Sequence, residues 1–447
     1  MKRIGKILSF INLFFFTFIL IYTLYRSQKF SNHQDYYDIF FLISVLGIIF
    51  WLIVILKLSE KKRFYISLIF SGLVLYCYLL EFAHLSYSKF ILKKKSYFEL
   101  YSELKLDNKK IVPSFPASYF LRNEIKNKNF IFNLGGVSLS KTLLCNEYDE
   151  DVIYHSDRYG FNNNDSNWDK KKLDIIFIGD SFTHGHCVFN EDNISNQVKK
   201  ITGKSYLNLA IIGNGPLIEL ATLKEYGNLN KPNYIIWQFY EGNDLEELKY
   251  ERKSLLLNKY INKDFTQNLH LKQSLIDDQL LNKIFPDELK KIQELKKKRI
   301  FDEFKKFLKL TNLRIIISKQ FLKNFEITKS SKFTTPEPID NFDQLKYFNE
   351  IILEAKRYTE DELNAEFIFL YIPSFYRYEY LKNNQNIYNS EQIVSFLKKN
   401  NIKYLNIHDQ IFSKIEDPLA LYPTRSFGHL GKEAYKLIAK NLEIFIK

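Results

Sequence analysis

The sequence predicts an α/β domain built on a parallel sheet and preceded by three membrane-spanning helices. Apolar segments typical of buried strands alternate with amphipathic segments typical of helices over residues 171–245 and 342–447. This alternation is characteristic of crossover units, which place helices on both faces of a parallel sheet. Three long apolar runs near the N-terminus and a Lys-rich helical stretch between the two alternating parts complete the pattern.

The three apolar runs predict a membrane anchor over residues 1–90. They cover about residues 7–25, 39–56 and 64–83, and each is near the roughly 20 residues that cross a hydrocarbon core. Charged residues separate the runs, which disfavours buried helices of a water-soluble domain. A cleaved signal peptide is disfavoured too, because no small-x-small pattern follows the first run.

Basic residues beside the runs predict their orientation. Three lie within residues 2–6 and four within residues 57–63, whereas the first loop carries only Arg26 and Lys29. The positive-inside rule then places the N-terminus and the second loop in the cytoplasm. We therefore expect everything after residue 90 to lie outside a bacterial-type cytoplasmic membrane, in the periplasm or at the cell surface.

Composition excludes two other classes of protein. The chain of 447 residues has a net charge of +13, but no arginine-rich arm, zinc finger or helix-turn-helix pattern accompanies it. We therefore expect no nucleic-acid partner. Three cysteines in a chain of this length exclude a disulfide-stapled scaffold. Cys145 and Cys187 both fall outside by the predicted topology, and the sequence alone leaves open whether they pair.

The part after the anchor divides into three stretches. Residues 91–170 carry weak strand signals and are predicted to be a juxtamembrane segment that packs on the domain at 171–447. Lys-rich helices interrupt that domain as an insertion at about 246–325, which we expect to lie near the rim of the site. A Ser/Thr/Pro-rich linker follows at 330–340.

Five strands and five helices are predicted in the domain. The strands are 173–178, 206–212, 234–240, 367–372 and 403–407, and the helices are 192–202, 217–226, 342–361, 390–400 and 431–446. Each strand is a short apolar run, and the second helix begins after Pro216, a residue suited to the first turn.

Polar clusters follow the first three strands and precede the last helix. They read GDSFT at 179–183, GNGP at 213–216, EGND at 241–244 and SFGHLG at 426–431. Because ligands of an open α/β sheet bind at the carboxyl ends of its strands, we expect these clusters to form one site.

The clusters contain the groups that acyl transfer needs. Ser181 follows a strand, where its hydroxyl can project above the sheet, and His429 is the natural base to take its proton. The tetrahedral oxyanion requires donors that are in place beforehand. The backbone N–H groups of Ser181 and Gly213 and the side-chain amide of Asn243 can supply three.

These motifs resemble the four blocks of the SGNH (GDSL-like) hydrolase and acyltransferase family, in a membrane-anchored form. The matching stretches are GDSF at 179–182, NLAIIG at 208–213, GND at 242–244 and GHLGKEAY at 428–435. The resemblance implies a three-layer α/β/α, flavodoxin-like fold and ester chemistry without a metal or organic cofactor. It assigns the nucleophile to Ser181, the base to His429 and the oxyanion hole to Ser181, Gly213 and Asn243.

Membrane-tethered members of this family often add or remove acyl groups on extracytoplasmic glycans. The resemblance therefore implies a serine esterase or O-acyltransferase acting on O-acyl groups of cell-envelope or exported polysaccharide. Its expected partners are the ester or glycan substrate and the lipid bilayer. Acyl transfer would also require a donor, which a membrane partner can supply.

The sequence departs from the family at one position. The last block usually has Asp three residues before the His, and here that residue is Ser426. The carboxylate normally orients the imidazole and stabilises its charged form. Either a backbone carbonyl, a water or a distant carboxylate such as Asp409 or Asp417 orients His429, or catalysis is weak or lost and the protein binds or assembles glycans.

Four neighbouring residues receive supporting roles. Asp180 and Asp244 are expected to hold turns by hydrogen bonds, and His184 and Ser426 are candidates for the lining of a substrate pocket. His184 and His186 have no third ligand at a recognised spacing, so no metal site is expected.

Overall fold

The structure is a computed structural model that divides the chain into two units. It describes residues 2–29, 34–91, 97–106, 110–122, 130–146, 150–262, 265–316, 342–380, 390–423, 425 and 428–446. The N-terminal unit comprises Met1–Lys93 and Leu295–Ser330, and the sheet unit comprises Lys94–Glu294 and Ser331–Lys447. The predicted linker 330–340 and Ser426 lie outside the described residues.

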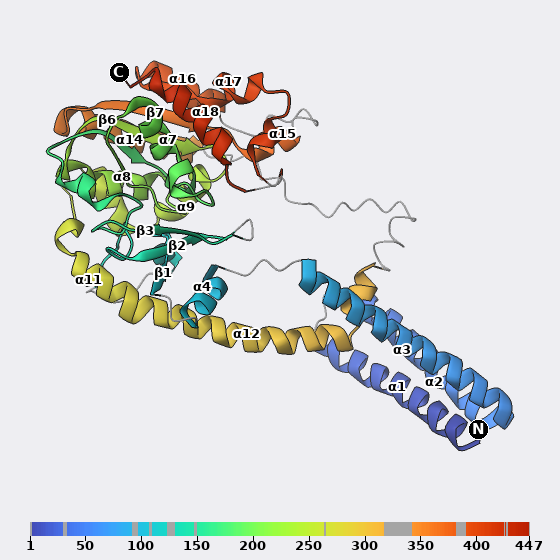
Figure 1. Ribbon diagram of the computed structural model, residues 1–447. Coiled ribbons are helices and arrows are strands. Elements are labelled where there is room, and N and C mark those ends of the chain that lie inside the picture. Colours follow the sequence, from blue (N-terminus) through green and yellow to red (C-terminus); the bar gives the residue numbers. More distant parts are fainter. Residues whose placement is uncertain are drawn as a thin grey trace. The chain divides into compact units, whose positions relative to one another are not determined.

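Three long helices open the N-terminal unit (Figure 1): α1 (Lys2–Lys29), α2 (Gln34–Lys57) and α3 (Glu60–Ile91). Each contains a stretch long and apolar enough to cross a membrane, which confirms the three predicted apolar helices. Asn12 of α1 accepts a hydrogen bond from Ser71 Oγ of α3 at 3.1 Å. Such interhelical polar contacts help to join helices in an apolar medium.

The sheet unit is built on five parallel strands in the order β5-β4-β6-β7-β8. The strands are β4 (Lys172–Ile178), β5 (Tyr206–Asn208), β6 (Lys231–Tyr240), β7 (Glu366–Ile372) and β8 (Lys403–Asn406). Numbered along the chain, this order is 2-1-3-4-5, which is the flavodoxin-like doubly wound arrangement. The predicted α/β fold with a parallel sheet is confirmed.

Alternate residues of each strand enter two separate apolar cores. Ile176 and Trp237 belong to one core and Ile175 and Ile236 to the other, all fully buried. Neighbouring side chains of a strand point to opposite faces, so both faces of the sheet are covered. Helices α8 (Pro216–Tyr226), α14 (Phe342–Arg357) and α16 (Ser390–Lys399) supply the first core, and α7 (Ile194–Thr202) and α18 (Lys432–Glu443) the second. The molecule therefore has the three layers α/β/α.

Strand β5 is shorter than the 206–212 expected from its apolar sequence. The chain leaves the ladder after Asn208, although Leu209 N–H still donates to Phe177 O at 2.9 Å. It then turns at Gly213, whose φ of +69° favours glycine. The apolar residues that follow Asn208 are buried as loop rather than as strand.

Two further parts belong to the sheet unit. The juxtamembrane stretch holds α4 (Tyr97–Leu106), α5 (Tyr119–Arg122) and a small sheet of β1 (Ile111–Pro113), β2 (Lys141–Cys145) and β3 (Val152–His155), in that order. Near the C-terminus lie α15 (Phe375–Tyr380) and α17 (Ile407–Gln410). Strand pairing is parallel between β1 and β2 and antiparallel between β2 and β3.

The described part of the insertion after β6 is mostly helical. It comprises α9 (Asp244–Glu251), α10 (Leu255–Asn258), α11 (Gln273–Asp278), a π-helical turn (Gln279–Ile284) and α12 (Phe285–Leu308). The boundary between the two units falls inside α12, so its residues from Leu295 onward group with α1, α2 and α3.

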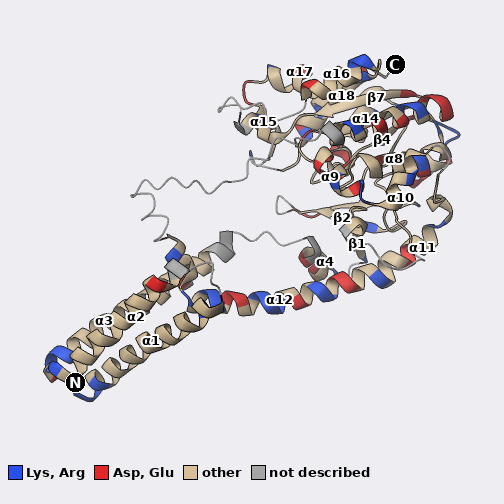
Figure 2. Ribbon diagram, turned by 180° about the vertical axis from the view of Figure 1, so that it is seen from behind, with Lys and Arg blue, Asp and Glu red and all other residues tan. Residues whose placement is uncertain are grey.

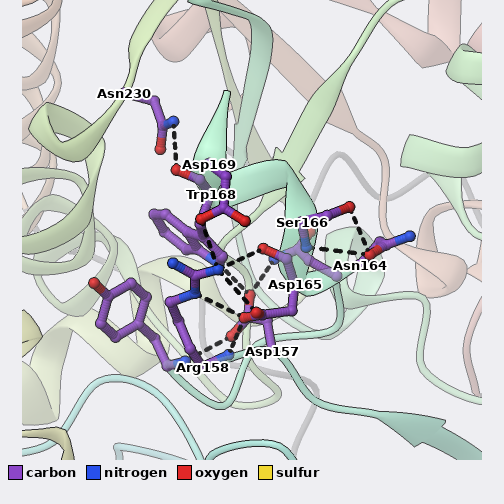
Figure 3. A network of polar contacts seen from close by, with 10 residues as sticks. Asp157, Arg158, Asn164, Asp165, Ser166, Trp168, Asp169 and Asn230 are labelled. Atoms are coloured by element: carbon purple, nitrogen blue, oxygen red, sulfur yellow. Dashed lines mark hydrogen bonds and ion pairs between the residues drawn. The ribbon is translucent and has the colours of Figure 1, made fainter. Parts of the chain in front are cut away.

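A buried carboxylate organises the loop that precedes β4 (Figure 3). Asp157 Oδ1 accepts the N–H groups of Tyr159 and Phe161, both at 2.9 Å. Its Oδ2 accepts Asn163 Nδ2 and Trp168 Nε1, both at 2.8 Å. Burial raises the pKa of Asp157 to about 6, and the four donors act in the opposite direction.

This network continues through Asn163 to the end of β5. Asn163 Nδ2 donates to Asn208 O at 3.0 Å, and Asn208 N–H donates to Asn163 Oδ1 at 2.7 Å. The side-chain amide of Asn208, which is fully buried, donates to Thr183 O at 2.7 Å and to Ser195 Oγ at 3.0 Å. Hydrogen bonds thus connect the loop before β4 to the first turn after it.

Replacing Asn208 by Leu, which is close in size, should lower the free energy of unfolding by about 2–4 kcal/mol, because buried hydrogen-bond partners are left unpaired. The matched control is Asn282→Leu, an exposed position whose side chain bonds only its neighbour on the same turn, Asp278. That change should stay within about 0.5 kcal/mol. Chemical unfolding of the purified proteins in detergent measures both, and equal losses would contradict the assigned role of Asn208.

Candidate active site

Ser181 lies at the turn between β4 and a short helix, α6 (Ser181–His184). Asp180 is the N-cap of this helix, and its Oδ1 accepts Phe182 N–H at 2.9 Å. Gly185 ends the helix in the left-handed region at φ +79°. Because Asp180 caps the helix, the Ser181 hydroxyl is not used for that purpose.

The structure brings His429 to Ser181 across 248 residues of sequence. His429 Nε2 lies 2.9 Å from Ser181 Oγ, which is a hydrogen-bonding distance. The imidazole packs on the rings of Phe182 and His186, with centroid distances of 5.1 and 4.5 Å. These ring contacts fix the position of the imidazole. Leu430, the next residue, is fully buried and so anchors the backbone beside His429. This is the geometry of a hydroxyl and the base that removes its proton.

The two further residues predicted for the oxyanion hole lie at the ends of the neighbouring strands. Gly213 follows β5; a Cβ there would lie 3.1 Å from Ser118 Oγ, a tight contact, and the φ of +69° at this position favours glycine. Asn243 follows β6 and directly precedes α9. Its Nδ2 lies 3.4 Å from Asp180 Oδ2, a long hydrogen bond that orients the amide. Their roles as donors stay predictions.

Asp180 and Asp244 are fully buried and hold backbone turns. Asp244 Oδ2 accepts Tyr240 N–H at 2.8 Å, which ties the start of α9 to the end of β6. Burial raises the pKa of both carboxyls, and in Asp244 the nearby charge of Asp180 raises it further. The charge of His429 acts in the opposite direction on Asp180, so these two groups interact electrostatically.

Gln238 of β6 forms hydrogen bonds with Asp180 and with Thr183 of α6. Its amide faces Asp180 Oδ1 at 2.8 Å and Thr183 Oγ1 at 2.9 Å. We assign the amide nitrogen to this side because a carboxylate accepts and cannot donate. The first turn of α6 is thus fixed to the central strand of the sheet.

The two carboxylates that the sequence suggested for orienting His429 are bound elsewhere. Asp409 Oδ2 accepts Asn406 Nδ2 at 2.8 Å, and Asp417 pairs with Arg425 at 2.6 Å. Ser426, which stands where the family has aspartate, lies outside the described residues. Asp180 is a buried carboxyl whose pKa the charge of His429 lowers.

Glu251 of α9 fixes the turn that carries Gly213. Its carboxylate accepts Gly215 N–H at 2.7 Å and Leu217 N–H at 2.8 Å, and so caps α8, whose N-cap Gly215 has no side chain to do so. Burial raises the pKa of Glu251 to about 8, although both N–H donors lower it. Sequence reasoning missed Glu251, but a helix that begins with Gly-Pro signals that its cap must come from another segment.

Glu241, from the third polar cluster, has a structural partner that the sequence did not reveal. It forms an ion pair with Arg377, and its Oε2 accepts Ser374 N–H at 2.9 Å. Its Oε1 accepts Tyr371 O–H at 2.5 Å. Glu241 therefore joins the carboxyl ends of β6 and β7.

Two polar side chains beneath the site are buried without a hydrogen-bond partner among the described residues. They are Asn214 and Glu219, each with no exposed surface. Burial, and then the charges of Asp244 and Asp180, raise the pKa of Glu219 well above its usual value. The fold thus disfavours the charged form of Glu219.

His184 does not lie where a substrate could reach it. Its side chain is fully buried and packs edge-on against Tyr154 at 5.4 Å between centroids. Burial lowers its pKa to about 3, so the imidazole is neutral. The expectation that His184 lines a substrate pocket finds no support in this position.

Cys145 and Cys187 form a disulfide, which the sequence had left open. The bridge joins the end of β2 to the loop after α6 that carries His186. The sulfurs of both cysteines and one nitrogen of His186 lie within 4.8 Å of one another, a spacing that could hold a metal ion if the bridge were reduced. In the disulfide form these sulfurs are not thiolate ligands.

Comparison with known proteins gives limited similarity. Neither a protein-family model nor a curated protein sequence matches this chain. One solved structure that it resembles is "Structure of a putative lipolytic protein of G-D-S-L family from Desulfitobacterium hafniense DCB-2", with 13% sequence identity and a TM-score of 0.30. The match covers 61% of this chain and 97% of that one.

Removing the disulfide by Cys145→Ser together with Cys187→Ser should lower the free energy of unfolding by about 2–4 kcal/mol, because the unfolded chain gains freedom over the closed loop. Guanidinium unfolding of full-length protein in detergent, followed by tryptophan fluorescence, measures the change. Reductant should destabilise the wild type by a similar amount and leave the double variant unchanged. A wild type that ignores reductant would contradict the bridge.

Glu251 should make stability fall as the pH rises. Its pKa is about 8 in the folded protein and 4.5 for an unperturbed glutamate, so the folded state favours the protonated carboxyl. The stabilisation that this proton gives is complete below the unfolded pKa and is lost as the pH rises through the folded pKa. Between about pH 5 and pH 9, the free energy of unfolding should therefore drop more steeply in the wild type than in Glu251→Gln.

The matched control for this titration is Glu191→Gln, because the Glu191 side chain is exposed. It should reproduce the wild-type slope over the same pH range. Parallel slopes for the wild type and Glu251→Gln would show that Glu251 titrates alike in both states, contrary to the expectation.

Proposed function

We propose that this protein is a membrane-anchored serine ester hydrolase or O-acyltransferase that acts on O-acyl groups of cell-envelope or exported polysaccharide. The observation that carries the proposal is the 2.9 Å contact between Ser181 Oγ and His429 Nε2 at the carboxyl edge of a parallel sheet. The placement of Gly213 and Asn243 at the two adjacent strand ends supports it.

In the proposed reaction, Ser181 Oγ attacks the ester carbonyl carbon while its proton passes to His429 Nε2. The carbonyl oxygen becomes an oxyanion, which the N–H groups of Ser181 and Gly213 and the amide of Asn243 stabilise. The ester C–O bond then breaks, and His429 returns the proton to the leaving alkoxide. The product is an acyl ester on Ser181 and a free hydroxyl.

The second half of the reaction decides between hydrolysis and transfer. Neutral His429 takes a proton from the acceptor as its oxygen attacks the acyl-Ser181 carbonyl, and the proton then returns to Ser181 Oγ. Water as the acceptor gives an esterase, and a glycan hydroxyl gives an O-acyltransferase. Transfer would draw on an acyl donor supplied outside the membrane, for which a membrane partner is our proposal.

Electrostatics within the site are compatible with a Ser–His pair that lacks the usual aspartate. When His429 takes the proton, it becomes a cation, and the Asp180 carboxyl is close enough for their charges to interact. In the ionised state, Asp180 would stabilise that cation. We propose that this interaction replaces part of what an aspartate at position 426 would supply.

We also propose that the sheet unit lies outside the cytoplasmic membrane, with the N-terminus of α1 in the cytoplasm. The basic residues at 2–6 and 57–63 support this orientation. The Cys145–Cys187 disulfide supports it independently, because disulfides persist in oxidising compartments.

Release of acetate from p-nitrophenyl acetate by the full-length protein in detergent tests the activity. Ser181→Ala and His429→Ala should each lower kcat by at least about 10³-fold, because neither half of the pair works alone. The matched controls are Ser166→Ala and His155→Ala, whose side chains are exposed and which should retain wild-type turnover.

Covalent capture separates the two classes of function. A fluorophosphonate should label Ser181 in the folded wild type, and mass spectrometry should find the acyl group on the same residue. A folded protein with neither turnover nor labelling would overturn the enzyme proposal and favour a glycan-binding or assembly protein. Acetylated polysaccharide offered with and without an acceptor glycan then distinguishes hydrolysis from transfer.

A further inference from the structure

The second half of α12 carries large apolar side chains that are exposed to solvent. Ile300, Phe301, Phe304 and Leu308 are 51–69% exposed. At 3.6 residues per turn, these four positions fall on one side of the helix. An exposed apolar stripe of this kind marks an interaction surface.

Basic residues are numerous in α12 (Figure 2). Residues 296–306 contain six basic side chains and only two acidic ones, Asp302 and Glu303. Lys305 Nζ lies 4.0 Å from the centre of the Phe301 ring and 3.7 Å from Asp302 Oδ1, so this basic side chain covers part of the apolar stripe and reaches toward its polar side. Long basic side chains of amphipathic helices behave in this way at a membrane surface.

The segment that follows the stripe is bound to the third apolar helix. Glu81 of α3 is fully buried, and its carboxylate accepts Asn312 N–H at 3.0 Å and Leu313 N–H at 2.8 Å. These N–H groups belong to the first turn of the helical segment 311–316, so the Glu81 carboxylate caps the N-terminus of that segment. Tyr78 O–H of α3 also donates to Leu308 O at 3.0 Å.

These contacts fall at one end of the three apolar helices. Tyr78 and Glu81 lie near the end of the apolar stretch Glu60–Tyr87. Lys309 Nζ lies 5.5 Å from the ring of Tyr22, near the end of α1, and the Arg314 guanidinium lies 5.4 Å from the ring of Phe40, near the start of α2. Because α1 ends, α2 begins and α3 ends on the same side, residues 308–314 lie at that end of the three apolar helices.

We propose that residues 295–308 lie on the bilayer as an amphipathic interfacial helix whose partner is an anionic lipid surface. The apolar stripe enters the boundary between headgroups and acyl chains, and the basic side chains face the headgroups. The occupant is lipid because the stripe continues directly into residues already fixed at the end of the apolar helices, and because its charge is complementary to anionic headgroups. The proposal does not depend on the reaction at Ser181.

Site-directed spin labelling of the full chain in phosphatidylglycerol-containing liposomes tests the proposal. Labels are placed by Phe304→Cys on the stripe and by Asp302→Cys on the opposite side, each in a Cys77→Ser background, since Cys77 is the free cysteine among the described residues. The readout is the collision rate of each label with oxygen, which concentrates in lipid, and with a water-soluble nickel chelate.

The ratio of oxygen to nickel collisions should be at least about threefold higher at position 304 than at position 302. High nickel access at 304 would mean that the stripe faces water, and low access to both reagents would mean that protein covers it. Either result overturns the proposal. In liposomes of phosphatidylcholine alone, the ratio at 304 should decrease, because the basic side chains lose their partners; an unchanged ratio would overturn the anionic part of the proposal.

Discussion

The hydrogen bonds of Asn208 are the constraint on which the position of Ser181 most depends. Asn208 ends the edge strand β5, and its buried amide reaches the carbonyl of Thr183, two residues after Ser181. Its backbone is fixed in turn by Asn163, which the Asp157 carboxylate holds. A buried polar group without a hydrogen-bond partner costs free energy, and each of these residues supplies a partner for the next one in the network. The loop before β4 therefore helps to determine where the hydroxyl lies.

Buried acids form a second layer of support beneath the strand ends. Asp180 and Glu251 cap the two helices that follow β4 and β5, and Asp244 ties α9 to β6. Acids so far from water are expensive to ionise, and the raised pKa values of all three reflect this cost. The site thus keeps three backbone turns in place with carboxyl groups rather than with the more common hydroxyl caps.

Local patterns predicted the sheet well because each strand is a compact apolar run with a polar cluster at its end. The pairing of Ser181 with His429 could also be anticipated. Polar clusters at the carboxyl ends of parallel strands meet at one edge of the sheet, and the sequence predicted that the loop of His429 joins them there. The end of β5 and the cap supplied by Glu251 could not be predicted from local patterns, because contacts with residues distant in the sequence determine both. The apolar run after Asn208 reads as strand, yet the turn at Gly213 removes it from the ladder.

The route of the chain through the N-terminal unit has a consequence for biogenesis. Helices α1, α2 and α3 are synthesised first, but Asn312, whose N–H group Glu81 accepts, is made 231 residues after Glu81. Until then the Glu81 carboxylate must find other partners, in water or at the headgroups. The anchor is thus complete only after β4, β5 and β6 have been made, and a chain that ended at Lys93 would leave the Glu81 carboxylate without the N–H groups of Asn312 and Leu313.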